Sequence, residues 1–135
     1  MRLESAIICD AATVREGLVH ILGGGVSVLS RAQFPATMGV SVAIGVRLIV
    51  EELAVEQSIG VAVNDVAGAL VGSMETEIVV PREVNQPGGP PVIPLVVPIG
   101  MILLPAEGVY SVEISVNGKA QISLPFEARL LEVES

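Results

Sequence analysis

The side chains best suited to chemistry lie close together in residues 9–25, CDAATVREGLVHILGGG. This segment holds the only cysteine and the only histidine of the chain, Cys9 and His20, with Asp10 and Arg15 between them. A cysteine acts as a nucleophile when an adjacent base takes its proton and a third group orients that base. One hypothesis is therefore an enzyme centred on Cys9, Asp10 and His20.

The elements that would have to position this pair argue for a different interpretation. If residues 2–9 and 18–22 form a hairpin across residues 10–17, His20 lies nearer Ile7 than Cys9, diagonal to the thiol rather than opposite it. Cys9 also ends an apolar strand-like run, where a free cysteine usually behaves as a small buried hydrophobe. We therefore expect Cys9 to be buried. Asp10 would cap a short helical turn over DAATVREG that ends at Gly17.

Three consecutive glycines, Gly23, Gly24 and Gly25, raise the question of phosphate binding. A phosphate loop needs a helix N-terminus behind its glycines, with lysine and serine or threonine following. The residues that follow are VSVLS, which have the pattern of a strand, and no lysine is near. We interpret the glycines as a bend or a close approach of backbones.

The remaining polar groups predict no metal or cofactor site. Zinc prefers several cysteine or histidine ligands, and the chain has one of each. Arg15 and Glu16 are expected to form a solvated turn. The carboxylate pairs Glu51–Glu52 and Glu75–Glu77 have the pattern of exposed groups, with no visible reason for a raised pKa.

Composition limits the classes of partner. Hydrophobic residues make up 51% of the 135 residues and charged residues 16%, so polar material to cover the surface is scarce. We expect a partner to cover part of the apolar surface, and a homo-oligomer is the simplest arrangement. The net charge of −8 argues against nucleic acids and anionic membranes as partners. Neither a signal peptide nor a transmembrane segment is recognisable, which favours a cytoplasmic protein.

Alternation of apolar and polar residues predicts a single all-β domain over residues 1–135. In residues 38–51 the side chains at even positions are all apolar, whereas those at odd positions are mostly small, so something is expected to pack on the second face. Residues 64–68 and Asn117-Gly118 are expected to join hairpins. Residues 81–91, rich in proline and glycine, predict an irregular loop. The following run contains Pro94 and Pro98 and is expected at a sheet edge.

About eight strands at this spacing are typical of an antiparallel β-sandwich. The stretch LPAEGVY, residues 104–110, resembles the tyrosine corner of immunoglobulin and fibronectin type III domains, in which a tyrosine bonds to the backbone upstream. Tyr110 is the only tyrosine of the chain. This favours an immunoglobulin-like sandwich, although a fold marker carries no functional information.

A wider resemblance covers most of the chain. The stretch CDAATVREGLVHILGGGVSVL, followed by Phe34-Pro35, resembles the N-terminal pattern of an uncharacterised family of small bacterial proteins, most of them actinobacterial. The resemblance continues through VNDVAG and GVYSVEISVNG to Phe126. It implies no activity that can be transferred to this chain.

We expect a non-catalytic interaction or assembly module that self-associates through aliphatic sheet surface. An alternative is a carrier that holds a small apolar ligand between its sheets. Met38, Met74 and Met101 would line such a cavity, although methionines among valines and leucines usually fill cores.

Overall fold

The computed structural model describes residues 1–132, which form β-strands, turns and two short 3-10 helices. The strands are β1 (Arg2–Arg15), β2 (Leu18–Gly24), β3 (Val28–Arg31), β4 (Ala36–Thr37), β5 (Ser41–Arg47), β6 (Gln57–Asp65), β7 (Leu70–Ile78), β8 (Val92–Pro98), β9 (Leu103–Leu104), β10 (Gly108–Val116) and β11 (Lys119–Leu130). The 3-10 helices are η1 (Val50–Glu52) and η2 (Arg82–Val84). Over residues 1–132, neither helix has the length and apolar character needed to cross a membrane.

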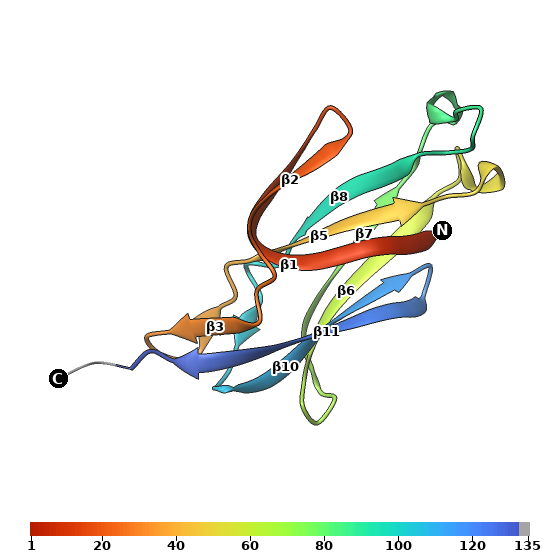
Figure 1. The fold of residues 1–135 in the computed structure, drawn as a ribbon. Coiled ribbons are helices and arrows are strands. Elements are labelled where there is room, and N and C mark those ends of the chain that lie inside the picture. The colour runs from red at the N-terminus through yellow and green to blue at the C-terminus, as the bar shows by residue number, and fades with distance from the viewer. Residues whose placement is uncertain (133–135) are drawn as a thin grey trace.

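Two sheets pack against each other as a sandwich (Figure 1). Sheet A has the strand order β2-β1-β5-β8, and sheet B has the order β3-β11-β10-β6-β7. All pairs are antiparallel except β3 with β11. The predicted all-β sandwich is confirmed. Eleven strands replace the expected eight, because residues 18–34 split into two strands and the short β4 and β9 form a separate pair.

The core lies between the two sheets and is almost entirely aliphatic. From β5, Val42, Ile44 and Val46 point inward, each at most 1% exposed, as the alternation predicts. They meet side chains of β6 and β10 that are equally buried: Ile59, Val61, Val63, Val112 and Ile114. Branched aliphatic side chains pack well on a pleated surface, so they fill the core with very few aromatic residues.

The predicted connections are largely confirmed. Asn117 and Gly118 form the two-residue turn between β10 and β11, both with positive φ. Asp65 closes the β6–β7 hairpin because its carboxylate accepts hydrogen bonds from the amides of Ala67 and Ala69. Residues 81–91 contain only η2 and an isolated bridge, and β8 with its two prolines is an edge strand.

The tyrosine corner has the expected hydrogen bond. The Tyr110 hydroxyl donates to the carbonyl oxygen of Ala106 at 2.7 Å, four residues upstream. The Tyr110 ring stacks on Phe126 of β11, with ring centroids 5.6 Å apart. The corner therefore ties the connection before β10 to the core.

The prediction of a helical turn over DAATVREG is wrong. Residues 10–15 continue β1, and Glu16 and Gly17 alone form the turn to β2, with φ of 55° and 74°. Two consecutive positive φ values match the twist of the adjoining strands, as in type I′ hairpins. A glutamate in the first of these positions is uncommon, which is why the sequence pattern concealed the turn.

Candidate functional site

The short turn decides where the predicted reactive residues lie. Arg15 pairs with Leu18, and from there the register places His20 opposite Thr13. Cys9 instead pairs with Gly24 in β2 and with Ser41 in β5. His20 is therefore level with a residue four positions from Cys9, or about 13 Å along the strand. The expected position of His20 near Ile7 is wrong, and the structure does not bring Cys9 and His20 together.

Cys9 is completely buried, with 0% of its surface exposed. Its Sγ lies 3.5 Å from the carbonyl oxygen of Ser41, a weak hydrogen bond at most. Burial raises the pKa of the Cys9 thiol, an effect that the backbone of Ala43 opposes and that the charge of Asp10 reinforces. This environment favours the protonated thiol over the nucleophilic thiolate.

The glycines act on the backbone, as predicted. A Cβ on Gly23 would lie 2.8 Å from the Cβ of Asp10, so the two strands approach more closely there than any side chain permits. Gly25 leaves β2 with φ of 83°, and its amide and that of Val26 both donate to the carbonyl oxygen of Ile8. Gly24 packs against Ile7 and Ile21. The triplet thus anchors the base of the hairpin.

Contrary to the expectation, the pKa of one carboxyl in each carboxylate pair is shifted. The pKa of Glu77 is raised, because its carboxyl shares a hydrogen bond with Glu56 and is also repelled by Glu75. Partial burial raises the pKa of Glu52, but hydrogen bonds from the Met1 amino group and the Ile49 amide outweigh it, so the net shift is downward. The Glu77 group is fully exposed, and three or more metal-ligating side chains do not gather anywhere in residues 1–132.

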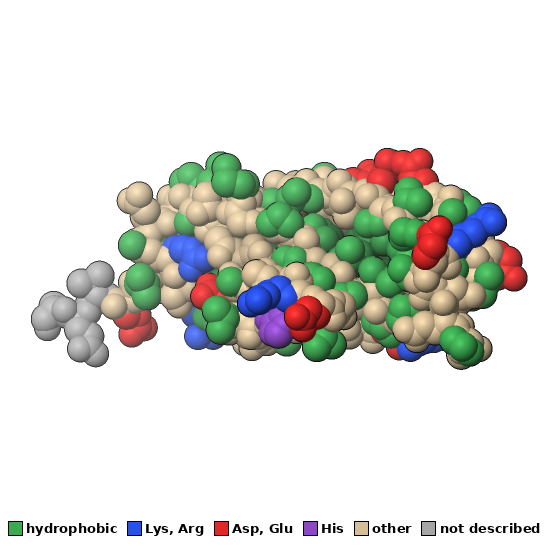
Figure 2. Space-filling view, turned by 90° about the horizontal axis from the view of Figure 1, so that it is seen from above, with side chains coloured by type: hydrophobic (Ala, Val, Ile, Leu, Met, Phe, Trp, Pro, Cys, Tyr) green, Lys and Arg blue, Asp and Glu red, His purple; other side chains and the backbone are tan. Residues whose placement is uncertain are grey.

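The most distinctive concave surface is an apolar groove on the outer face of sheet A, with a volume of about 490 Å³. The tip and one side of the β1–β2 hairpin form one wall, through Gly17, Leu18, Val19 and Ile21. The floor and far wall come from β1, β5 and β8: Ser5, Ala6, Ile7, Ala43, Ile44, Gly45, Val92 and Pro94. We call this the hairpin groove. Figure 2 looks down on this side of the molecule, where hydrophobic side chains gather in the middle, with a group of basic, acidic and histidine side chains beside them and further charged ones toward the margins.

The small side chains of β5 make the hairpin groove possible. Gly45 and Ala43, with Ala43 only 3% exposed, form a low floor. A Cβ on Gly45 would lie 2.9 Å from the Ser5 hydroxyl and 3.1 Å from a methyl of Val92. These neighbours belong to β1 and β8, the strands that flank β5 in the same sheet, and only the hairpin wall rises over the small-residue face that the sequence predicted to be covered. The sequence did not reveal Leu18, Val19 and Ile21 as a wall, since that depends on how the hairpin curls.

A second hollow, of about 600 Å³, follows the hairpin itself and is more polar. Its lining includes Thr13, Arg15 and His20. Asp10, the remaining residue of the predicted reactive cluster, is exposed at the base of the hairpin beside Gly23. These polar groups lie on a hairpin surface, whereas the hairpin groove lies between separate elements and is the better candidate for recognition.

The three methionines do not share a cavity. Met38 is in the core with 0% exposure, whereas Met74 is 39% and Met101 88% exposed. The prediction that they line one ligand cavity is therefore wrong. Met101 occupies the turn before β9, which a strand-period pattern alone could not distinguish from a buried position.

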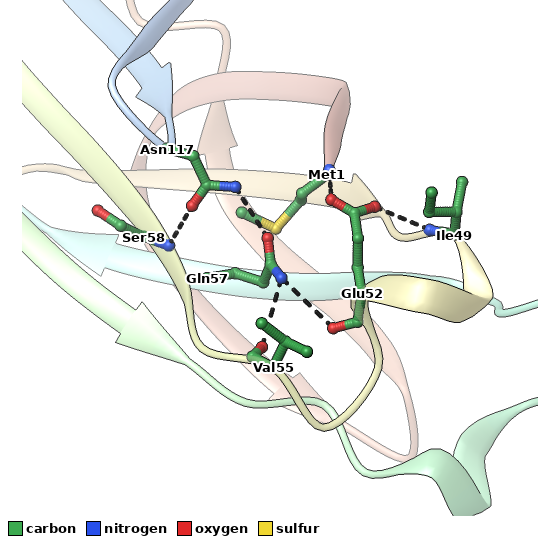
Figure 3. A network of polar contacts seen from close by, with 7 residues as sticks. All are labelled: Met1, Ile49, Glu52, Val55, Gln57, Ser58 and Asn117. Atoms are coloured by element: carbon green, nitrogen blue, oxygen red, sulfur yellow. Dashed lines mark hydrogen bonds and ion pairs between the residues drawn. The ribbon is translucent and has the colours of Figure 1, made fainter.

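A polar network joins η1, the start of β6 and the turn between β10 and β11 (Figure 3). Gln57, 4% exposed, donates from Nε2 to the carbonyl oxygens of Glu52 and Val55 and accepts from the Asn117 side chain at 2.8 Å. The Asn117 Oδ1 in turn accepts from the Ser58 amide. Every buried polar side-chain atom among the described residues has a partner. Because the network satisfies its own groups, we assign it a structural role.

Replacing Gln57 with leucine should lower the free energy of unfolding by about 1–3 kcal/mol, because Asn117 and two carbonyl groups lose a buried partner. Urea denaturation followed by circular dichroism measures this. Gln121→Leu, at an exposed position of β11, is the matched control and should change stability by less than about 0.5 kcal/mol. Equal effects of the two substitutions would contradict the structural role.

Comparison with known proteins adds a family but no activity. Residues 4–129 match the model of a family of unknown function, DUF6941. Among the curated proteins and the solved structures compared with the chain, none matches. The matched range includes both sheets, the hairpin and the hairpin groove. This chain therefore belongs to the DUF6941 family of unknown function.

Proposed function

We propose that the protein is a non-catalytic interaction or assembly module that self-associates through aliphatic surface on sheet A and the β1–β2 hairpin. The observation that carries this proposal is the exposed aliphatic surface of β2 beside the apolar hairpin groove, of which Leu18 forms part of the wall. Leu18 is 64% exposed and Leu22 is 72% exposed on a strand with no carboxylate. Exposed aliphatic groups beside an apolar hollow are typical of a surface that a partner covers.

Other features of the chain support the remaining parts of the proposal. We infer an immunoglobulin-like sandwich, supported by the Tyr110 hydroxyl bond to Ala106. We also infer a bacterial, actinobacterial origin, supported by the N-terminal pattern CDAATVREGLVHILGGG, and a cytoplasmic location, supported by the unbridged Cys9. The net charge of −8 supports protein partners over nucleic acids.

Light scattering after size exclusion, over a wide range of protein concentration, tests self-association directly. We expect the mean mass to rise above 13.9 kDa as concentration increases. Leu22→Gln should shift this rise to at least about tenfold higher concentration, corresponding to 1.4 kcal/mol. Leu70→Gln is the matched control, since Leu70 is 63% exposed on β7 of sheet B. A constant monomeric mass at all concentrations would contradict the proposal.

The second candidate function is a carrier of a small apolar ligand. Its supporting observation is the size of the hairpin groove, about 490 Å³, which falls in the range of about 300–1,000 Å³ that ligand sites occupy. This places the ligand outside sheet A rather than between the sheets, where core side chains lie. Solvent extraction of the purified protein followed by mass spectrometry tests it. A stoichiometric apolar compound would favour the carrier, and its absence from monomeric and oligomeric fractions alike would contradict it.

A further inference from the structure

Among the described residues, the outer edge of β2 has no strand paired to it, although the hairpin curls toward β8 across the hairpin groove. β2 is the first strand of sheet A, and over residues 1–132 its only strand partner is β1. In a two-residue hairpin the pair that flanks the turn is hydrogen-bonded, and such pairs alternate along the ladder. Arg15↔Leu18 flanks the turn, so Leu18, His20 and Leu22 direct their amides and carbonyls toward β1. Val19 and Ile21 direct theirs outward.

The other outermost strands of sheets A and B carry features that block pairing. β8 contains Pro94 and Pro98, which lack an amide hydrogen. β7 carries Glu75 and Glu77, and β3 has only four residues. Prolines, charges and shortness are the usual means of protecting an edge strand. β2 has seven residues and none of these charges or prolines, so it is the edge most open to a further strand.

The residues of β2 are nearly symmetric about His20. They read Leu18-Val19-His20-Ile21-Leu22, so a second copy aligned antiparallel about His20 places Leu18 opposite Leu22 and Val19 opposite Ile21. In this register the outward-pointing backbone amide and carbonyl of Val19 face those of Ile21 in the other copy, so the two residues can form a hydrogen-bonded pair. Each exposed leucine also gains an aliphatic partner. A shift of one residue would pair outward groups with inward groups.

We propose that two copies of this chain pair through their β2 edges, antiparallel and with a two-fold axis at His20. This rests on the proposed function and specifies how the self-association occurs. The result is a four-stranded ribbon made of the two β1–β2 hairpins, because residues 18–22 of β2 pair with residues 11–15 of β1, beyond the part of β1 that pairs with β5. Pairing stops at two copies because the two-fold contact uses the β2 edge of both chains. Five residue pairs make a smaller contact than the standard interface of about 1,600 Å², so we expect a reversible dimer with a Kd in roughly the micromolar range.

Disulfide trapping tests the register. In a Cys9→Ala background, His20→Cys places two thiols at a non-hydrogen-bonded pair, where Cα atoms lie about 4.5 Å apart, within the range that disulfides span. Leu18→Cys or Leu22→Cys alone leaves like thiols about 13 Å apart. We expect the His20→Cys variant to cross-link under mild oxidation at least about tenfold faster than either leucine variant. A mixture of Leu18→Cys and Leu22→Cys proteins should cross-link one to the other.

A proline variant tests the hydrogen bonding independently. The Ile21 amide points away from β1, so Ile21→Pro removes a donor of the outer edge without breaking a bond within the hairpin. We expect Ile21→Pro to remain folded by circular dichroism and to lose the dimer in light scattering. Ile21→Val, which keeps the amide, should retain the dimer.

The outcomes separate the two proposals. If wild-type mass rises with concentration but His20→Cys cross-links no faster than Leu22→Cys, the β2 pairing is wrong and self-association through another surface stands. If the mass stays monomeric and none of the variants cross-links, both proposals are wrong. Rapid cross-linking of His20→Cys together with loss of the dimer in Ile21→Pro would establish the edge pairing.

Discussion

In the folded protein, Cys9 should react with a thiol reagent at neutral pH at least about a hundredfold more slowly than in denaturant, because reaction requires the structure to open. The thiol has 0% exposure, and burial raises its pKa, so both access and the thiolate fraction are low. A chromogenic disulfide reagent with and without guanidinium measures the two rates.

Two variants give this measurement its controls. Ser73→Cys in a Cys9→Ala background places a thiol at an exposed position of β7 and should react at nearly the denatured rate. His20→Ala should leave the reactivity of Cys9 unchanged, because His20 pairs with Thr13 rather than with Cys9. Fast native labelling of Cys9 that His20→Ala abolishes would revive the enzyme hypothesis and overturn the register described above.

Replacing Ile114 with alanine should lower the free energy of unfolding by about 2–5 kcal/mol. Ile114 is 0% exposed on β10, between the two sheets, and its truncation leaves a cavity that the surrounding aliphatic side chains fill only partly. Since domains of this size are stable by about 5–15 kcal/mol, the loss is a large share of the total. Urea denaturation at a concentration where the wild type is monomeric measures it.

Ile49→Ala is the matched control for this prediction. Ile49 has the same side chain but is 60% exposed before η1, so its truncation should cost less than about 1 kcal/mol. Similar losses for the two substitutions would mean that the inward face of β10 is not the core.

Much of the fold was predictable because strand alternation assigns faces without knowledge of the partner strand. The apolar residues of β5 point inward as predicted, and Asn117-Gly118 turns the chain where it should. Tyr110 bonds to Ala106 as a tyrosine corner does. Each of these depends on a few neighbouring residues and on backbone sterics, which local sequence specifies.

The candidate site was much less predictable. The prediction that Asp10 begins a helical turn ended β1 six residues too early and placed His20 beside the wrong residue. Both errors come from the unrecognised turn at Glu16 and Gly17, because the register of a hairpin is set by its turn. The raised pKa of Glu77 was missed because its main cause, Glu56, lies 21 positions earlier in the chain, just before β6, the strand that pairs with β7.

Residue type and period alone were enough to predict the all-β class, the aliphatic core, the small-residue face of β5 and the positions of three hairpin or loop connections. The three-dimensional arrangement was needed to show that β2 is an edge strand, how far Cys9 lies from His20, and that the β1–β2 hairpin borders a groove over Ala43 and Gly45. Those features depend on strand order and on the curl of the hairpin. Both arise from contacts between residues far apart in the chain, which a local pattern does not encode.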